Sequence, residues 1–168
     1  MRNIVNEPDA SWMGKNSTLS KTEVDEFLQR PVVARLGTIR ADGWPYVVPV
    51  WQQWDGEAMW IVPREKSSFV RSIGEEPRVS VSVALEEAPY TRVQVQGMAE
   101  IIEGPVDSQG GSARWVPIAQ DMARRYLGQH GPEYLEPTMD RPRYLIRIRP
   151  VRLRTWEGVE WHEKYKST

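Results

Sequence analysis

Alternating apolar and polar residues dominate the middle and the end of the chain. In segment 78–84 every second residue is valine, and in 90–103 valines again alternate with polar side chains. A period of two is typical of β-strands that bury one face. Similar patterns predict further strands at 32–39, 44–54, 57–63 and 143–156.

Three of these strands are expected to form a meander. Turns at 41–43 and 55–56 join 32–39, 44–54 and 57–63 in chain order. The middle strand carries apolar residues on both faces, so both faces need cover, as in a barrel whose outside meets another subunit. Its two prolines place it at an edge or a bulge: Pro45 and Pro49.

The last strand, 143–156, places basic residues on one face. Its alternation predicts three inward apolar residues, Tyr144, Ile146 and Ile148, and three outward arginines, Arg143, Arg147 and Arg149. We interpret the outward arginines as solvated or paired with acids, because no aromatic residues for base stacking lie on the same face.

Helical spacing predicts three helices between the strands. Ser20 and Glu23 form a capping-box pattern ahead of a short apolar face, and Pro31 ends that helix. Segments 67–76 and 113–127 have the same kind of apolar spacing. About seven strands and three helices indicate a mainly β (α+β) fold, a closed antiparallel barrel with peripheral helices.

Length and composition limit the organisation and the function classes. The 168 residues suit one domain, which we expect to span 19–168 behind an N-terminal arm at 1–18. A formal net charge of -1 gives no global attraction to nucleic acid or to a membrane surface. Residues 1–20 hold no apolar run long enough for a signal peptide or a membrane span, so we expect a cytoplasmic protein.

Cysteine and histidine usage limits the chemistry. The chain has no cysteine, which excludes disulfides, thiolate catalysis and thiolate zinc sites. The two histidines are far apart and argue against a metal site. We expect His130 in a solvated loop, whereas His162 is either a hydrogen-bonding residue at the edge of the core or a substrate contact.

The most informative segment leads from a strand into a helix. A short loop with Arg64 and Lys66 precedes a helix that begins with Ser67 and Ser68. Cations and hydroxyls beside the free N–H groups of a helix N-terminus favour phosphate binding. The alternative is that Ser67 only caps the helix and the cations are solvated.

The order of the elements resembles a known family. A helix, a three-stranded meander and a cationic loop that opens a helix are followed by three segments, namely Pro77-Arg78-Val79-Ser80-Val81, Val93-Gln94-Val95-Gln96-Gly97-Met98-Ala99-Glu100 and Trp156-Glu157-Gly158. The chain from Ser20 onward is similar to the pyridoxamine 5'-phosphate oxidase-like flavoproteins. This resemblance implies a split antiparallel β-barrel and a homodimer that binds FMN, or in one branch a deazaflavin, at the subunit interface.

The resemblance also implies roles for individual residues. Val62, Pro63 and Arg64 would run along the flavin and its phosphate chain, and Lys66, Ser67 and Ser68, in the segment that extends to Arg71, would hold the phosphate. Arg92 would contact the flavin ring. Near the other subunit the implied contacts are Trp156 and Lys164 for the cofactor, and His162 for the substrate.

The sequence departs from the oxidase at positions that hold its basic residues. Val47, Gln52, Ser68, Phe69 and Glu160 stand there. Because a doubly anionic substrate phosphate needs such cations, these departures argue against pyridoxamine phosphate oxidation. We therefore expect an FMN-dependent oxidoreductase with an unnamed substrate and unassigned catalytic residues. The alternatives are a deazaflavin-dependent reductase and a non-enzymatic binder of haem or flavin on the same fold.

Overall fold

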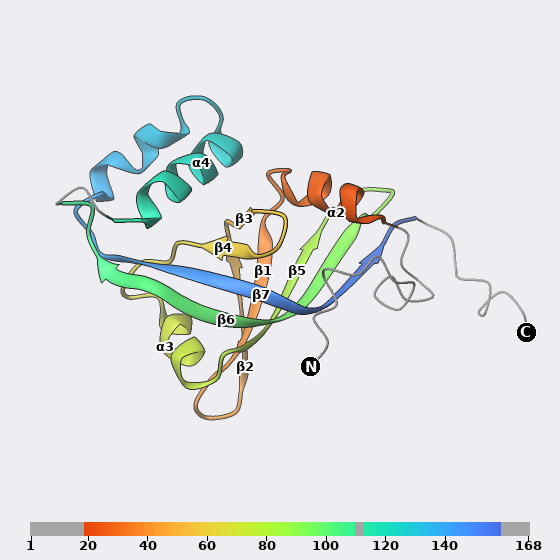
Figure 1. Cartoon of the computed structure of the whole chain (residues 1–168), viewed down its shortest axis with the longest axis horizontal. Helices are drawn as coiled ribbons and strands as arrows, with labels where there is room; N and C mark the ends of the chain where they lie inside the picture. The colour runs from red at the N-terminus through yellow and green to blue at the C-terminus, as the bar shows by residue number, and fades with distance from the viewer. Residues whose placement is uncertain (1–18, 110–112, 159–168) are drawn as a thin grey trace, which may run out of the picture.

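One antiparallel sheet of seven strands forms the frame of the chain (Figure 1). The computed structural model describes residues 19–109 and 113–158. The strand order is β2-β1-β5-β6-β7-β4-β3. The strands are β1 (Ala34–Ile39), β2 (Pro45–Val50), β3 (Gln53–Trp54), β4 (Met59–Ile61), β5 (Arg78–Ala84), β6 (Arg92–Val106) and β7 (Arg143–Trp156). The predicted mainly β split barrel is confirmed, but no strand pairing within the described residues closes the sheet.

The predicted three-stranded meander is wrong. β2 pairs with β1, as expected, but β3 and β4 form a hairpin that pairs with β7 and not with β2. β2 is an edge strand, in agreement with its prolines. Pro49 lies opposite Arg35 in this pairing. Its nitrogen carries no hydrogen, so it cannot donate to a strand on the other side.

The sheet curls strongly, because its two edge strands are consecutive in the chain. β2 ends at Val50 and β3 begins at Gln53, so only Trp51 and Gln52 lie between opposite edges. Three backbone steps span at most about 11 Å. The curl brings the edges together without joining them, and the side chain of Gln52 is buried there, donating from Nε2 to the Leu28 carbonyl at 2.8 Å.

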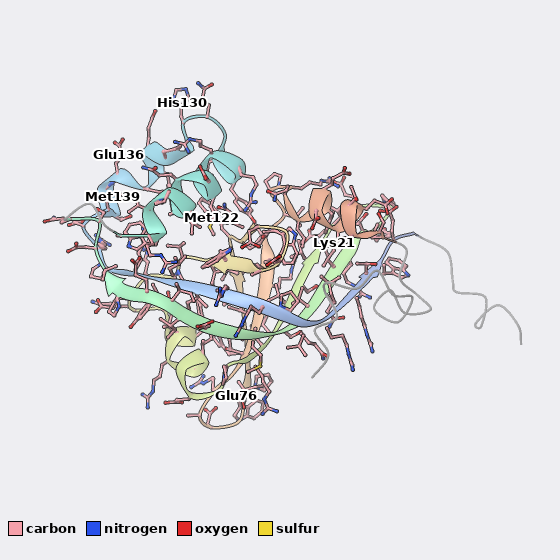
Figure 2. All side chains as sticks on the ribbon, viewed as in Figure 1. Lys21, Glu76, Met122, His130, Glu136 and Met139 are labelled. Carbon is pink, nitrogen blue, oxygen red and sulfur yellow. The ribbon has the colours of Figure 1, made fainter. Side chains whose placement is uncertain are left out.

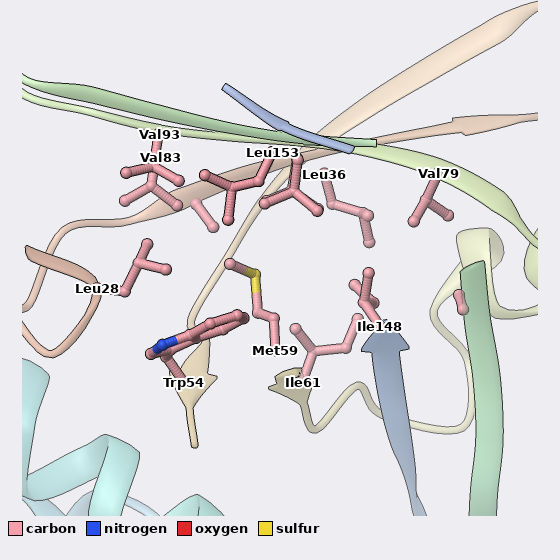
Figure 3. Packing of buried hydrophobic residues seen from close by; sticks show 14 of the residues in the cluster. Leu28, Leu36, Trp54, Met59, Ile61, Val79, Val83, Val93, Ile148 and Leu153 are labelled. Atoms are coloured by element: carbon pink, nitrogen blue, oxygen red, sulfur yellow. The ribbon is translucent and has the colours of Figure 1, made fainter. Parts of the chain in front are cut away.

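The core lies inside this curl. Figure 3 shows valines of β5 and β6 and Leu153 of β7 facing Trp54, Met59 and Ile61 of the β3–β4 hairpin. Helix α2 (Lys21–Leu28) closes one end with its buried residues Val24, Phe27 and Leu28. Its N-terminus has the predicted capping box, in which Ser20 accepts from the Glu23 backbone N–H. Each fully buried apolar side chain contributes about 1.5 to 3 kcal/mol.

The remaining helices lie at the opposite end of β7 from α2 and on the sheet's flank (Figure 1). Helix α3 (Ser68–Glu75) follows β4, and α4 (Trp115–Leu127) continues into two 3-10 turns, η1 (Gly131–Tyr134) and η2 (Glu136–Thr138). α4, η1 and η2 form a helical lobe. The turn packs closely on the helix, since a Cβ on Gly131 would lie 2.0 Å from the Ala123 carbonyl oxygen. Only glycine fits at that crossing.

The helical lobe explains a wrong prediction on β7. Arg143, expected to point outward into solvent, is buried at 7% exposure, whereas Arg149 is exposed as expected and Arg147 is half-buried. Alternation separates the two faces of a strand but does not show what covers each face. Here Trp115 and Thr138 of the lobe cover the outer face at the start of β7.

Some sequence predictions fall outside the described residues. These are the arm at 1–18 and the tail residues His162 and Lys164. Among the helices of the described residues, none combines the length and the apolar character that a bilayer crossing needs. Within residues 19–109 and 113–158, no cluster of three His, Asp or Glu side chains could hold a metal ion.

Candidate functional site

A cavity of about 380 Å³ lies where β4 leads toward α3. One part of the lining comes from the end of β2 with Trp51, and another from the loop after β4 with Val62, Pro63 and Arg64. Ser67 and Phe69 come from the start of α3, and Arg143 from β7. The helical lobe supplies the last wall, formed by Ala119, Met122, Tyr134 and Leu135. The cavity therefore lies between the curled sheet and the lobe.

The backbone of β7 holds the cationic loop in place. Pro63 accepts a hydrogen bond from the Tyr144 backbone N–H at 3.0 Å, and the Glu65 N–H donates to the Pro142 carbonyl at 3.0 Å. Between these bonds Arg64 and Arg143 form an antiparallel bridge. The loop then turns, with the Ser67 N–H donating to the Arg64 carbonyl at 2.9 Å. This arrangement places Arg64 at the cavity.

The helix-cap alternative holds only in part: Arg64 and Lys66 are exposed, as it expects, but Ser67 makes no side-chain cap. Ser67 occupies the N-cap position of α3, but its side chain makes no capping hydrogen bond. The hydroxyl is thus available at the cavity, next to the N–H groups of the helix start. A helix N-terminus carries a partial positive charge that favours an anion.

The other predicted phosphate contacts are divided between the cavity and its neighbourhood. Ser68 and Arg71 line a second cavity of about 360 Å³, between α3 and the β1–β2 turn. Phe69, which is buried, lines both cavities and separates them. Arg71 is paired with Glu75, with Nε 3.0 Å from Oε1. Lys66 is exposed in the loop and lines neither cavity.

Arg143 is a site residue that the sequence reasoning missed. Its guanidinium group lies 5.3 Å from the ring centroid of Trp115, and Nη2 donates to Thr138 Oγ1 at 2.8 Å. Burial lowers the pKa of Arg143, and the nearby positive charge of Arg64 lowers it further. The local sequence carries no signal for this position, since an arginine at a strand end is usually solvated.

An aromatic stack supports the apolar side of the cavity. The ring centroids of Trp51 and Tyr126 are 5.0 Å apart, and the ring planes are 3° from parallel. The ring of Tyr134 packs against Trp51 at a tilt, with centroids 5.9 Å apart. Burial raises the pKa of the Tyr126 hydroxyl, which donates to the Val32 carbonyl. Figure 2 shows Met122 on the side of α4 that faces the sheet. This wall can hold a planar apolar group and exclude water from it.

Arg92 and Trp156 do not reach this cavity within one chain. They pair with each other, with the Arg92 guanidinium 6.0 Å from the indole centroid. Arg64 pairs with the first residue of β7 and Arg92 with the last, and the ends of β7 lie far apart in Figure 1. The strand has 14 residues, a path of about 45 Å.

The positions that differ from the oxidase and lie within residues 19–109 and 113–158 have structural roles or face solvent here. Val47 is 66% exposed on β2, and Phe69 is buried. His130 lies at the outer end of the lobe, exposed and within 2.8 Å of Glu133, as its predicted loop position suggested (Figure 2). The described part of the chain therefore brings no imidazole to the cavity.

Several solved structures share this fold. An F420 reductase is 29% identical, with a TM-score of 0.62, over 77% of this chain and 94% of that protein. A FAD-binding protein from Mesorhizobium loti is 24% identical, with a TM-score of 0.59, over 84% and 96% of the two chains. The haem storage protein HutZ from Vibrio cholerae is 18% identical, with a TM-score of 0.56, over 77% and 88%.

Comparison of the sequence with known families assigns the chain to one of them. No curated protein sequence matches the chain. A family profile, however, matches residues 20–157, which include the cationic loop, the cavity walls and the whole sheet. The profile is that of pyridoxamine 5'-phosphate oxidase, and the chain therefore belongs to this family.

Proposed function

We propose that this chain is an oxidoreductase that binds a phosphorylated flavin-type cofactor, with FMN as the first candidate, in the cavity beside the β4–α3 loop. The observation that carries this proposal is that Ser67 and Arg64 line the same cavity at the start of α3. The Ser67 hydroxyl makes no capping hydrogen bond, so it is available to a ligand. A cavity with an anion-binding end and apolar walls suits a molecule in which a chain links a planar ring to a phosphate.

The proposed division of labour assigns binding and positioning to the protein. Arg64 and Ser67 would hold the phosphate, and Lys66 would add positive charge from its exposed position in the same loop. Ser68 and Arg71 line the neighbouring cavity and are left out of this phosphate site. The bound flavin would supply two-electron transfer. Val62 and Pro63 would line the cofactor, and Trp51 and Met122 would exclude water. No cysteine nucleophile is required, which agrees with the composition.

We further propose a homodimer in which each site draws on both chains. All of β2 is at least partly exposed, with Val47 at 66% and neighbouring Trp44 at 71%. A second copy of the chain that packs on β2 would bury the apolar side chains that the chain's own core leaves exposed. Arg92 and Trp156, remote from Arg64 in their own chain, would then contact the cofactor of the partner.

The second candidate cofactor is the deazaflavin F420. The F420 reductase shares 29% identity with the chain, a higher identity than the FAD-binding and haem storage proteins have. A deazaflavin coenzyme also carries a phosphate at the end of a chain attached to a planar ring, so the same residues would bind it. Haem has less support, because the described histidine, His130, lies at the outer end of the lobe.

The visible spectrum of the purified chain tests the proposal. Bands near about 370 and 450 nm indicate a flavin, a band near about 420 nm the deazaflavin, and a sharp Soret band haem. If the protein is colourless, titration with FMN and with F420 decides between them. Failure to bind either at micromolar concentration would refute the proposed function.

A further inference from the structure

Arg143 is a buried cation with most of its hydrogen-bonding capacity unused. The residue is 7% exposed, and its Nε is buried without a partner among the described residues. A guanidinium group has five N–H donors, and here one of them, on Nη2, has an acceptor, Thr138. Burying an unpaired charge is costly unless hydrogen bonds or a counter-charge compensate. The surroundings of Arg143 are therefore suited to a group that supplies both.

Arg64 adds a second positive charge at the same place. The two residues lie directly opposite each other in an antiparallel bridge, where Cβ atoms on one face are about 4.5 to 5.5 Å apart. Within residues 19–109 and 113–158, no carboxylate forms an ion pair with either arginine. Like charges placed opposite each other destabilise a sheet pair, and an anion shared between them would reverse this effect.

Both arginines line the cavity, and the rest of its wall strengthens the case for an anion. Val62, Met122 and Leu135 are apolar neighbours in the same lining. Around the buried Arg143 water screens charges poorly, so attraction between its guanidinium group and an oxoanion is stronger than at the surface. The planar fork of an arginine matches two oxygens of a carboxylate or a phosphate.

We infer that Arg64 and Arg143 together bind one oxoanion, a carboxylate or a phosphate, of a molecule that occupies this cavity. The inference adds a β7 residue to the site and rests on the proposed function for the identity of that molecule. The oxoanion has two sources, the phosphate of the cofactor or an acidic group of the substrate. In the second case the substrate is an acid with an apolar body.

Binding of simple anions to the full chain without cofactor tests the subsite itself. Calorimetric titration with inorganic phosphate and with benzoate should show binding of at least one probe to the wild type. Arg143→Gln should weaken that binding about tenfold or more. Arg149→Gln, on the exposed part of the same strand, should leave it unchanged. Equal affinity in the wild type and Arg143→Gln, or no binding of either probe to the wild type, would overturn the inference.

Comparison of FMN with riboflavin, which lacks the phosphate, separates the two sources. If the cofactor phosphate is the oxoanion, Arg143→Gln weakens FMN but not riboflavin. If the substrate supplies it, both flavins bind as before, and benzoate binds the FMN-loaded variant more weakly. Retained phosphate binding without binding of FMN, riboflavin or F420 would refute the proposed function and leave the subsite supported.

A second variant protects the test against misfolding. Arg143 also contacts Trp115 and Thr138, so Arg143→Gln could loosen the helical lobe. Arg64→Gln removes the other cation at an exposed position, so the fold should stay intact. It should weaken binding of the same anion, by a smaller factor than Arg143→Gln, because water screens an exposed charge. Normal anion affinity in a folded Arg64→Gln variant would contradict the shared subsite.

Discussion

The indole of Trp51 stacks on the phenol ring of Tyr126, with centroids 5.0 Å apart and planes 3° from parallel. Trp51 lies in the two-residue link between the opposite edges of the sheet, and Tyr126 lies in the last turn of α4. The stack thus joins the curled sheet to the helical lobe. Trp51 itself lines the cavity, so the stack supports part of the cavity wall.

Removing this stack should destabilise the fold and weaken cofactor binding. Trp51→Ala is expected to lower the free energy of unfolding by about 2 kcal/mol, because the variant has no ring to pack against Tyr126. Trp51→Phe keeps a ring in the stack and should be destabilised by less than half as much. Urea unfolding measures both, and equal stability of Trp51→Ala and the wild type would contradict the role given to the stack.

The cationic loop is expected to bind the cofactor phosphate. Replacing Lys66 and Ser67 together by Ala should weaken FMN binding by about 1.5 to 3 kcal/mol for each charge-assisted hydrogen bond that is removed. Arg124→Ala, an exposed cation on α4, serves as the control. Fluorescence titration measures the affinities. Unchanged FMN affinity in the double variant would remove the loop from the site.

The exposed strand β2 should form the dimer interface. Val47→Asp places a charge on a side chain that is 66% exposed in one chain, so the chain itself should still fold. Buried in an interface of about 2,000 Å², the charge should produce monomers that no longer hold the cofactor. Leu127→Asp, exposed at the end of α4, should remain dimeric. Light scattering distinguishes the two, and a wild-type monomer near 19.4 kDa that binds flavin stoichiometrically would exclude the shared site.

Arg92 should raise the reduction potential of the flavin that is bound across that interface. Arg92→Leu removes a positive charge from beside a ring that becomes negative on reduction, so the reduction potential should fall. Arg124→Leu should leave the potential as it is. Spectroscopic redox titration of the FMN-loaded dimer provides the measurement, and an unchanged potential would mean that Arg92 does not face the ring.

Asp55 should make stability depend on pH in the acid range. Burial raises the pKa of its carboxyl, but hydrogen bonds from Trp60 and from the Ala58 and Glu57 N–H groups outweigh burial, and the pKa lies below 3.8. The folded pKa is below the unfolded one. The carboxylate therefore stabilises the fold above about pH 4, and this stability is lost as the pH falls through the folded pKa.

Asp55→Asn separates this effect from other acid-labile groups. The variant should be about 1 kcal/mol less stable than the wild type at pH 7, a value that allows for solvent screening of a partly exposed group. The difference should shrink as the pH falls below the folded pKa. Thermal unfolding between pH 7 and pH 2 measures it, and a difference that does not vary with pH would assign the effect to packing.

Local patterns by themselves determined most elements of this protein. The capping box at Ser20 and Glu23 specifies the start of α2, and alternating valines specify β5 and β6. These features depend on residues that are only a few positions apart, so the local sequence is enough to predict them. The sequence also predicted a cationic loop that leads into a helix, and Arg64 and Ser67 of this segment line one cavity.

Only the tertiary structure decided how distant segments meet. The β3–β4 hairpin pairs with β7, nearly ninety residues away in sequence, because the chain crosses between sheet edges at Trp51 and Gln52. The same pairing sets Arg143 opposite Arg64, and the helical lobe then covers it. Alternation shows that Arg143 and Arg149 share a strand, but burial depends on what packs above each of them. That information lies in contacts between remote segments, so no local pattern records it.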